Sequence, residues 1–284
     1  MKKVLVTGAN GQLGQSIRKI HKSYSEYTFI FKNKDILDIT NFEEINEFFD
    51  LHSINICVNC AAYTAVDKAE DEPGEAFQVN TIGPEVLAKA CQRNGALLVH
   101  ISTDFVFDGE STVPYKETDD PRPISIYGKT KWEGEKRIQA NHDQYFIVRT
   151  SWVFSEFGSN FVKTMCRLGK EKDELKVVVD QYGCPTYAVD LAHFIMELIR
   201  NQEKIQYGIY NFCNTDKTNW YSFAKYIMEQ ANISCKVQST PASSYPTKAI
   251  RPKYSVLDTT KTITDMGVQI RSWKDGVRDV IGVL

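Results

Sequence analysis

A tyrosine and a lysine stand four residues apart in the stretch Tyr127-Gly-Lys-Thr-Lys131. In a helix, this spacing places both side chains on one face. A phenol has a reference pKa of about 10, so it exchanges protons poorly near neutrality. A neighbouring ammonium stabilises the phenolate and lowers that pKa, which makes such a pair an acid/base catalyst. Tyr127 is therefore a candidate proton donor, and Lys131 is the group expected to tune it.

The apolar run Ala96–Ser102 is predicted to be a parallel strand. At its end, Ser102-Thr103-Asp104 places two hydroxyl side chains and a carboxylate. In doubly wound sheets, ligands bind at the carboxyl ends of the strands. A hydroxyl at this position can polarise a substrate oxygen beside Tyr127. The alternative for either hydroxyl is capping of a loop.

Three glycines spaced three apart, Gly8, Gly11 and Gly14, follow a predicted strand at Lys3–Thr7 and open a helix. Glycine allows the tight turn and lets the backbone approach a pyrophosphate, while the start of the helix offers free N–H groups. The spacing differs from the usual dinucleotide fingerprint, and a purely structural turn is the alternative. The position after the first strand favours dinucleotide binding.

A lysine stands about 20 residues further on, where an acid would bind the ribose 2′-hydroxyl of NAD. In the segment Phe31-Lys32-Asn33-Lys34, a lysine would favour the 2′-phosphate of NADPH. The alternative is a pair of solvated surface lysines at the end of a strand. Asp38 follows and is placed to contact the adenine.

Short apolar runs alternate with amphipathic helical stretches through the first two thirds of the chain. The predicted strands are Lys3–Thr7, Tyr27–Lys32, Ile54–Cys60, Ala96–Ser102, Gln144–Arg149 and Leu175–Val179. Helices are predicted from Asn41, which with Glu44 forms a capping-box-like start, and over Ala76–Arg93. This alternation predicts an α/β fold, a Rossmann-like doubly wound parallel sheet covered on both faces.

The pattern loosens after about residue 150. A Gly/Pro loop at Asp180–Thr186 is followed by a predicted helix at Val189–Arg200, a strand at Gly208–Cys213 and a helix at Tyr221–Gln230. We expect an NAD(P)-binding domain over 1–150, rejoined by about 175–200, and a smaller substrate-binding lobe over 151–284.

The composition is that of a globular protein, with 42% hydrophobic and 25% charged residues and a net charge of −2. It offers no basic surplus for nucleic acid and no apolar run near the ~20 residues that span a membrane. Seven cysteines are typical of free thiols in a reducing cytoplasm. Cys57 and Cys60 are spaced like a redox or zinc pair, but in a strand they point to opposite faces and are expected in the core.

Together these motifs resemble the extended short-chain dehydrogenase/reductase family over nearly the whole chain. The motifs that carry the resemblance are Gly8–Gly14, Ala61–Glu70, Ser102–Phe107, Tyr127–Lys131, Arg149–Val153, Asp180–Thr186 and Arg251–Pro252. The resemblance implies NAD(P)H-dependent reduction of a dTDP-linked 4-keto-6-deoxysugar, for surface polysaccharide.

The resemblance also implies roles for single residues. Those assigned to the cofactor are Gly8, Gly11, Gln12, Leu13, Gly14, Lys32, Asp38, Ile39, Ala61, Ala62 and Tyr63, together with Tyr127 and Lys131, the latter on the nicotinamide ribose. Thr103 would polarise the substrate oxygen, Asp104 would contact the sugar, and Trp152 would pack on it. Arg251 is a candidate for the sugar nucleotide's diphosphate, since a guanidinium grips phosphate oxygens with two bonds.

Several expectations stay open at this point. Both NADH and NADPH serve in the family. Some members are magnesium-bridged homodimers, but Gln15 stands where an acid would follow the glycine loop, so a metal is doubtful. A non-catalytic dinucleotide-binding regulatory subunit is one alternative, and a nucleotide-sugar epimerase or dehydratase is another.

Overall fold

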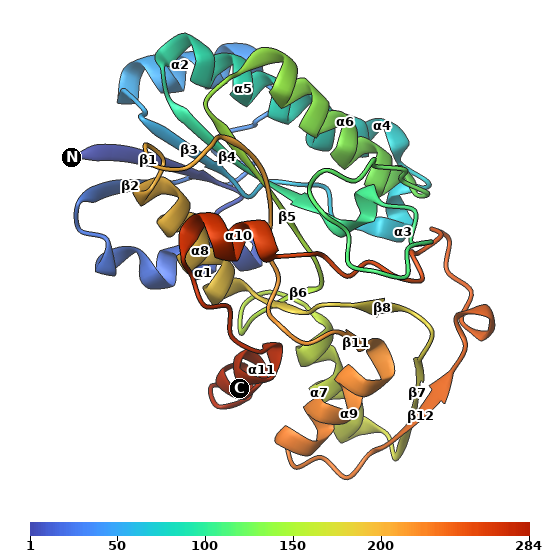
Figure 1. Ribbon diagram of the computed structural model, residues 1–284. Helices are drawn as coiled ribbons and strands as arrows, with labels where there is room; N and C mark the ends of the chain where they lie inside the picture. The colour runs from blue at the N-terminus through green and yellow to red at the C-terminus, as the bar shows by residue number, and fades with distance from the viewer.

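Six parallel strands form the central sheet of the protein, which the computed structural model describes over residues 1–284 (Figure 1). Their order is β10-β5-β4-β3-β1-β2. The strands are β1 (Lys2–Thr7), β2 (Tyr27–Phe31), β3 (Ile56–Asn59), β4 (Leu97–Thr103), β5 (Tyr145–Thr150) and β10 (Gly208–Asn211). The predicted doubly wound parallel sheet is therefore confirmed, and each predicted strand boundary in the first 150 residues lies within two residues of the observed one.

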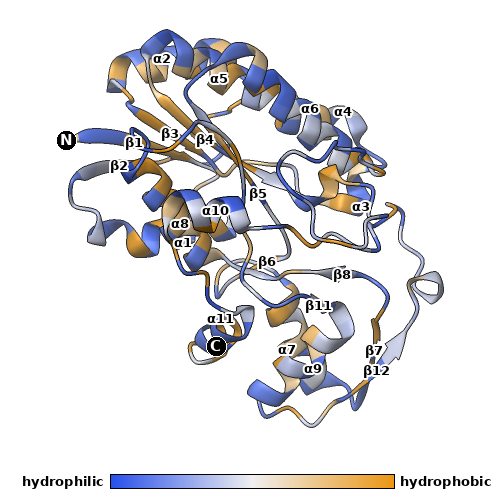
Figure 2. Ribbon diagram, viewed as in Figure 1, coloured by the Kyte–Doolittle hydropathy of each residue, from blue (hydrophilic) through white to orange (hydrophobic).

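Helices cover both faces of this sheet because its strands are apolar on both sides (Figures 1 and 2). Alternate residues of β1 go to opposite cores: Leu5 packs with α2 and α5, whereas Val4 and Val6 pack with α1 and α8. The helices on the first face are α2 (Phe42–His52), α5 (Gly83–Asn94) and α6 (Ile126–Asn141), and those on the second are α1 (Gln12–Ile20) and α8 (Ala188–Arg200). A strand buried on both faces has no polar alternation, which is why these runs read as continuously apolar.

The predicted helix over Ala76–Arg93 is built from three consecutive pieces. These are α4 (Pro73–Phe77), a π-helical turn (Gln78–Ile82) and α5. Within the π turn, Asn80 accepts a hydrogen bond from the Tyr63 backbone N–H at 2.8 Å and donates to the Tyr63 carbonyl at 3.0 Å. The turn thus fixes the segment that follows β3, which the short helix α3 (Val66–Ala69) continues.

A smaller lobe lies below the carboxyl ends of the central strands in Figure 1. It contains α7 (Phe161–Glu171) and α9 (Trp220–Gln230), with β7 (Glu174–Val178) paired to β12 (Lys236–Thr240). Short two-residue strands join the lobe to the sheet, and the chain ends with α10 (Thr260–Met266) and α11 (Trp273–Ile281). The short strands are β6 (Val153–Phe154), β8 (Tyr182–Gly183), β9 (Thr186–Tyr187) and β11 (Thr218–Asn219).

Two strands do not lie in the part of the protein, cofactor-binding domain or smaller lobe, in which the sequence predicted them. The strand predicted at Leu175–Val179 lies outside the central sheet, whereas β10, predicted for the lobe, is the edge strand beside β5. The reason lies in burial, because β7 buries only Leu175 and Val177 and leaves its other face in solvent. None of the helices is long and apolar enough to cross a membrane.

Candidate active site

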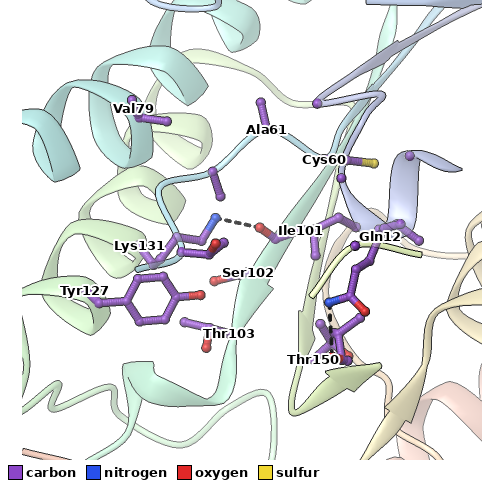
Figure 3. A pocket seen from close by; sticks show the side chains of 18 of the residues that line it. Gln12, Cys60, Ala61, Val79, Ile101, Ser102, Thr103, Tyr127, Lys131 and Thr150 are labelled. Carbon is purple, nitrogen blue, oxygen red and sulfur yellow. Dashed lines mark hydrogen bonds between the residues drawn. The ribbon is translucent and has the colours of Figure 1, made fainter. Parts of the chain in front are cut away.

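A cavity of about 1000 Å³ opens at the carboxyl ends of β1, β3, β4 and β5 (Figure 3). Its wall includes the glycine loop and Asp38, then Thr103, Tyr127 and Lys131, and also the indoles of Trp152 and Trp220. This volume is at the upper end of the range for small-molecule sites, so it has room for a dinucleotide and a second ligand. Parallel strands place ligands at this edge, as the sequence predicted.

The glycine loop is shaped for close backbone approach. Gly8 has a φ of +61°, and a Cβ there would lie 2.5 Å from the Ala61 backbone nitrogen. A Cβ on Gly14 would lie 2.6 Å from the Cα of Ala9. Helix α1 begins after Gly11 with no side-chain cap and no acid in its first turn. Its free N–H groups therefore face the cavity without a competing negative charge, an arrangement that fits a pyrophosphate.

Gln12 connects this loop to the smaller lobe. Its Oε1 accepts hydrogen bonds from Ser155 at 3.0 Å and Asn160 at 2.9 Å, and its Nε2 donates to the Val153 carbonyl at 3.3 Å. The adjoining Gly158 and Ser159 line the cavity opposite the loop. Sequence reasoning missed this segment, because nothing in its composition places it beside a loop about 145 residues earlier in the chain.

At the adenosine end, Asp38 and Ile39 line the cavity, and Asp38 accepts two hydrogen bonds from Thr40, at 2.8 and 2.9 Å. Lys34 also lines the cavity. Lys32 does not line it, and the Lys32 ammonium instead lies 5.4 Å from the Phe48 ring centroid.

Behind the glycine loop, Ala61 and Ala62 form part of the wall, whereas Tyr63 turns away and donates to Glu72 at 2.8 Å. Cys60, which was expected in the core, also lines the cavity, while Cys57 points to the other face and is fully buried.

Tyr127 and Lys131 both lie in α6, which approaches the end of β4 closely. A Cβ on Gly128 would lie 2.2 Å from the Phe105 carbonyl oxygen, so only glycine allows this contact. Ser125 caps the helix by accepting from the Gly128 N–H at 3.1 Å. The phenol of Tyr127 consequently points toward Ser102 and Thr103 (Figure 3).

The expected lowering of the tyrosine pKa is not what this state shows. Burial raises the pKa of Tyr127 to about 12, the neighbouring Thr103 side chain acts in the opposite direction, and the Asp104 charge adds to the rise. Lys131 does not offset the shift, because its Nζ donates to the Ile101 carbonyl at 2.6 Å. Burial also lowers the pKa of Lys131 to about 8. In this state Tyr127 therefore holds its proton, as a donor must.

The two neighbouring hydroxyls have different partners. Ser102 donates to Glu135, whereas Thr103, the hydroxyl beside the phenol, bonds only to its neighbours in the chain. Thr103 donates to Asp104 Oδ1 at 3.1 Å and accepts from the Phe105 N–H at 3.2 Å. The other oxygen of Asp104 is buried without a partner, and burial raises the pKa of this carboxyl to about 7. A sugar hydroxyl is the kind of donor that would satisfy it.

Two stacked indoles form part of the cavity wall. Trp152 has a φ of +47°, and its ring lies 3.5 Å from that of Trp220 at an angle of 8°. Gly183 leaves room for this indole, since a Cβ there would lie 2.6 Å from it. The loop at 180–186, expected at the substrate, thus supports Trp152 from behind and contributes nothing to the lining. Trp220, which sequence reasoning missed, does line the cavity.

Arg251 lies at the mouth of the cavity, in the segment that crosses from the smaller lobe to α3. Its guanidinium is bound to Asp67 by two hydrogen bonds, of 3.0 and 2.7 Å. Lys248 of the same segment pairs with Asp71. A diphosphate would therefore have to compete with Asp67 for this arginine.

The sheet, the glycine cradle and the Thr/Tyr/Lys set define an NAD(P)-dependent oxidoreductase of the extended short-chain dehydrogenase/reductase class. The protein-family model described as RmlD substrate binding domain matches residues 1–284. A dTDP-4-dehydrorhamnose reductase from Aggregatibacter actinomycetemcomitans is 39% identical over 99% of this chain and 98% of its own. The chain belongs to the dTDP-4-dehydrorhamnose reductase family.

Solved structures agree with this assignment. A dTDP-4-dehydrorhamnose reductase from Clostridium acetobutylicum has a TM-score of 0.95 and 44% identity, covering 99% of both chains. A Bacillus anthracis dTDP-4-dehydrorhamnose reductase, solved in complex with NADP, has a TM-score of 0.96 and 41% identity over 100% of both chains.

Proposed function

We propose that the protein reduces dTDP-4-dehydro-β-L-rhamnose to dTDP-L-rhamnose with NAD(P)H, the last step in making this sugar donor for surface polysaccharide. The observation that carries the proposal is one continuous cavity, which is lined by the glycine loop, by Thr103, Tyr127 and Lys131, and by Trp152. Family membership supports the choice of sugar nucleotide.

The residues have distinct tasks in this reaction. When bound along the glycine loop, NAD(P)H supplies the hydride for carbon 4 of the sugar. Tyr127 donates its phenolic proton to the oxygen at carbon 4, and Thr103 hydrogen-bonds the same oxygen. Asp104 accepts a hydrogen bond from a sugar hydroxyl, and the Trp152 indole covers the apolar face that carries the 6-methyl group.

A cofactor-oxidation assay over a panel of nucleotide 4-keto sugars tests the proposal. We expect dTDP-4-dehydro-L-rhamnose to be reduced with at least about tenfold higher kcat/KM than a UDP-linked or unlinked keto sugar, about 1.4 kcal/mol of discrimination. Tight cofactor binding without any NAD(P)H oxidation would favour the regulatory-subunit alternative. A cofactor that stays bound through purification would favour an epimerase.

Lys34 is expected to give a modest preference for NADPH. It lines the adenosine end of the cavity, where an ammonium can pair with a 2′-phosphate for roughly 1–3 kcal/mol, or tenfold upward. Lys34→Glu should therefore reduce kcat/KM for NADPH about tenfold and leave NADH within about twofold. Lys32→Glu is the matched control, since Lys32 lies outside the cavity. Equal efficiency of the wild type with both cofactors would refute the preference.

Trp152→Ala is expected to weaken binding of the sugar nucleotide by about 1–3 kcal/mol, through loss of one buried aromatic face. Cofactor affinity should stay unchanged, because we expect the backbone N–H groups at the start of α1, and not the indole, to bind the pyrophosphate. Calorimetric titration with each ligand measures both quantities. Trp152→Phe keeps a flat apolar face and should recover most of the loss; equal sugar-nucleotide affinity in wild type and Trp152→Ala would show that the sugar binds elsewhere.

A further inference from the structure

A chain of buried polar side chains runs across β1, β3 and β4 to Lys131. The Thr7 hydroxyl donates to Asn59 Oδ1 at 2.6 Å, and Asn59 Nδ2 lies 3.0 Å from His100 Nδ1. The other ring nitrogen, His100 Nε2, lies 3.2 Å from Lys131 Nζ. All four side chains are at most 1% exposed, so no water can exchange for a missing partner. Only the last member of this chain has a role in the reaction described above.

The orientation of the Asn59 amide is fixed by a backbone donor. The Ala61 N–H donates to Asn59 Oδ1 at 3.1 Å, and a backbone N–H cannot accept a hydrogen bond. The amide oxygen must therefore face Ala61 and Thr7, which turns the NH₂ group toward His100 Nδ1. That nitrogen has to accept, so a neutral imidazole carries its proton on Nε2.

The proton on Nε2 points at Lys131 Nζ. An ammonium has only donors, whereas a neutral amine has a lone pair that can accept this proton. Lys131 then still donates to the Ile101 carbonyl at 2.6 Å. If Lys131 is charged, His100 must accept instead and move its proton to Nδ1, where it would meet the NH₂ group of Asn59. Two buried donors would then face each other, which is unfavourable.

We propose that His100 is a positioning residue for the reduction: its Nε2–H, set by Asn59, hydrogen-bonds the neutral amine of Lys131 and so disfavours the charged lysine in the cofactor-free enzyme. The effect on turnover rests on the proposed function, but the hydrogen-bond arrangement does not.

The electrostatic surroundings agree with this arrangement. Burial is the main cause that holds the pKa of His100 well below its usual range, so the ring stays neutral. Around Lys131, burial lowers its pKa, while Glu135 on α6 and Cys60 after β3 act in the opposite direction. Tyr127 and Asp104 are the remaining titratable groups on this stretch of the cavity wall.

The tautomer can be measured directly, without substrate. Two-bond ¹H–¹⁵N NMR spectra distinguish the two neutral tautomers and the imidazolium, and the His100 signals are assigned by their absence from His100→Phe. At pH 8.5 to 9 without cofactor, we expect the Nε2–H pattern for His100. An Nδ1–H or imidazolium pattern overturns the proposal, whether or not the enzyme reduces the dTDP sugar.

Asn59→Asp tests the consequence for catalysis. A carboxylate accepts from Nδ1–H, so His100 should change tautomer and its Nε2 should accept from a charged Lys131. If the Lys131 ammonium tunes Tyr127 as the sequence predicts, turnover needs the charged lysine and should fall as pH rises through its pKa. Raising that pKa should then move the alkaline limb of kcat/KM upward by about one pH unit. The NMR pattern of this variant should change to Nδ1–H or imidazolium.

The added negative charge alone would act in the same direction, so it needs its own control. In a His100→Phe background, the shift caused by Asn59→Asp should fall by more than half; an undiminished shift would show that charge alone acts and would overturn the proposal. Gln92→Glu makes the same kind of change beside His142, a second buried histidine whose Nδ1 lies 2.7 Å from Gln92 Oε1. It should leave the alkaline limb where it is.

Discussion

Tyr127→Phe should lower turnover with the dTDP sugar by about two to four orders of magnitude, the usual contribution of a general acid. The phenol lines the cavity, points toward Thr103 and holds its proton, since desolvation raises its pKa to about 12. Phenylalanine fills the same volume and removes only the hydroxyl. The thermal unfolding midpoint and the dissociation constant for NADPH should therefore stay close to those of the wild type, while single-turnover rates fall.

Lys131→Ala is the informative comparison. If this lysine binds the nicotinamide ribose as well as tuning the phenol, its loss should weaken cofactor binding and turnover together. Near-wild-type turnover in Tyr127→Phe would transfer the proton-donor role to another group on the wall, with Thr103 the first candidate because its hydroxyl lies beside the phenol.

Glu135→Leu should lower the free energy of unfolding by about 3–5 kcal/mol, because it leaves a buried guanidinium without its partner. Glu135 and Arg149 are 1% and 2% exposed, and they are joined by hydrogen bonds of 2.7 and 3.1 Å. Glu135 also accepts from Ser102, so one carboxylate connects α6 to both β4 and β5. Since Lys131 lies one turn earlier on the same helix, turnover should fall as well. Urea unfolding followed by circular dichroism measures the stability change.

The double variant Glu135→Leu/Arg149→Met separates a buried charge from a lost contact. Replacing both partners with apolar side chains removes the unpaired charge, so much of the lost stability should return. Arg167→Ala breaks the exposed pair with Glu171 on α7 and should cost less than about 1 kcal/mol. A cost for Glu135→Leu no larger than this surface variant would show that the buried pair does not hold α6 in place.

Local sequence patterns were enough for the central sheet and for the residues most directly tied to chemistry. Continuous apolar runs such as Ala96–Ser102 predicted buried parallel strands, because burial on both faces leaves no polar alternation. Glycine spacing located the loop at Gly8–Gly14, and a four-residue spacing placed Tyr127 and Lys131 on one helical face. These features depend on neighbours within about one turn or one strand, so the sequence carries them in full.

The sequence did not predict which strands join the central sheet, because a strand's position depends on partners far away in the chain. The strand at Glu174–Val178 and the strand at Gly208–Asn211 were both predicted from the sequence, yet only the second joins the central sheet. Which edge a strand adds to is decided by the faces it can bury, and that is a property of the assembled layers.

The cavity wall shows the same division. Gly183 was part of a recognisable motif, but only the structure shows that it makes room for Trp152 and leaves the wall to Trp152 and Trp220. Side-chain direction likewise turned Tyr63 away to Glu72.

The sequence by itself determined the fold class, the cofactor loop and the Tyr127/Lys131 pair. Tertiary structure alone decided which hydroxyl bonds Glu135, which indoles line the cavity and how Asn59 and His100 meet Lys131. Those contacts join residues that are 31 to 68 positions apart in the chain. A periodic pattern in one segment holds no information about the atoms that a distant segment will place against it.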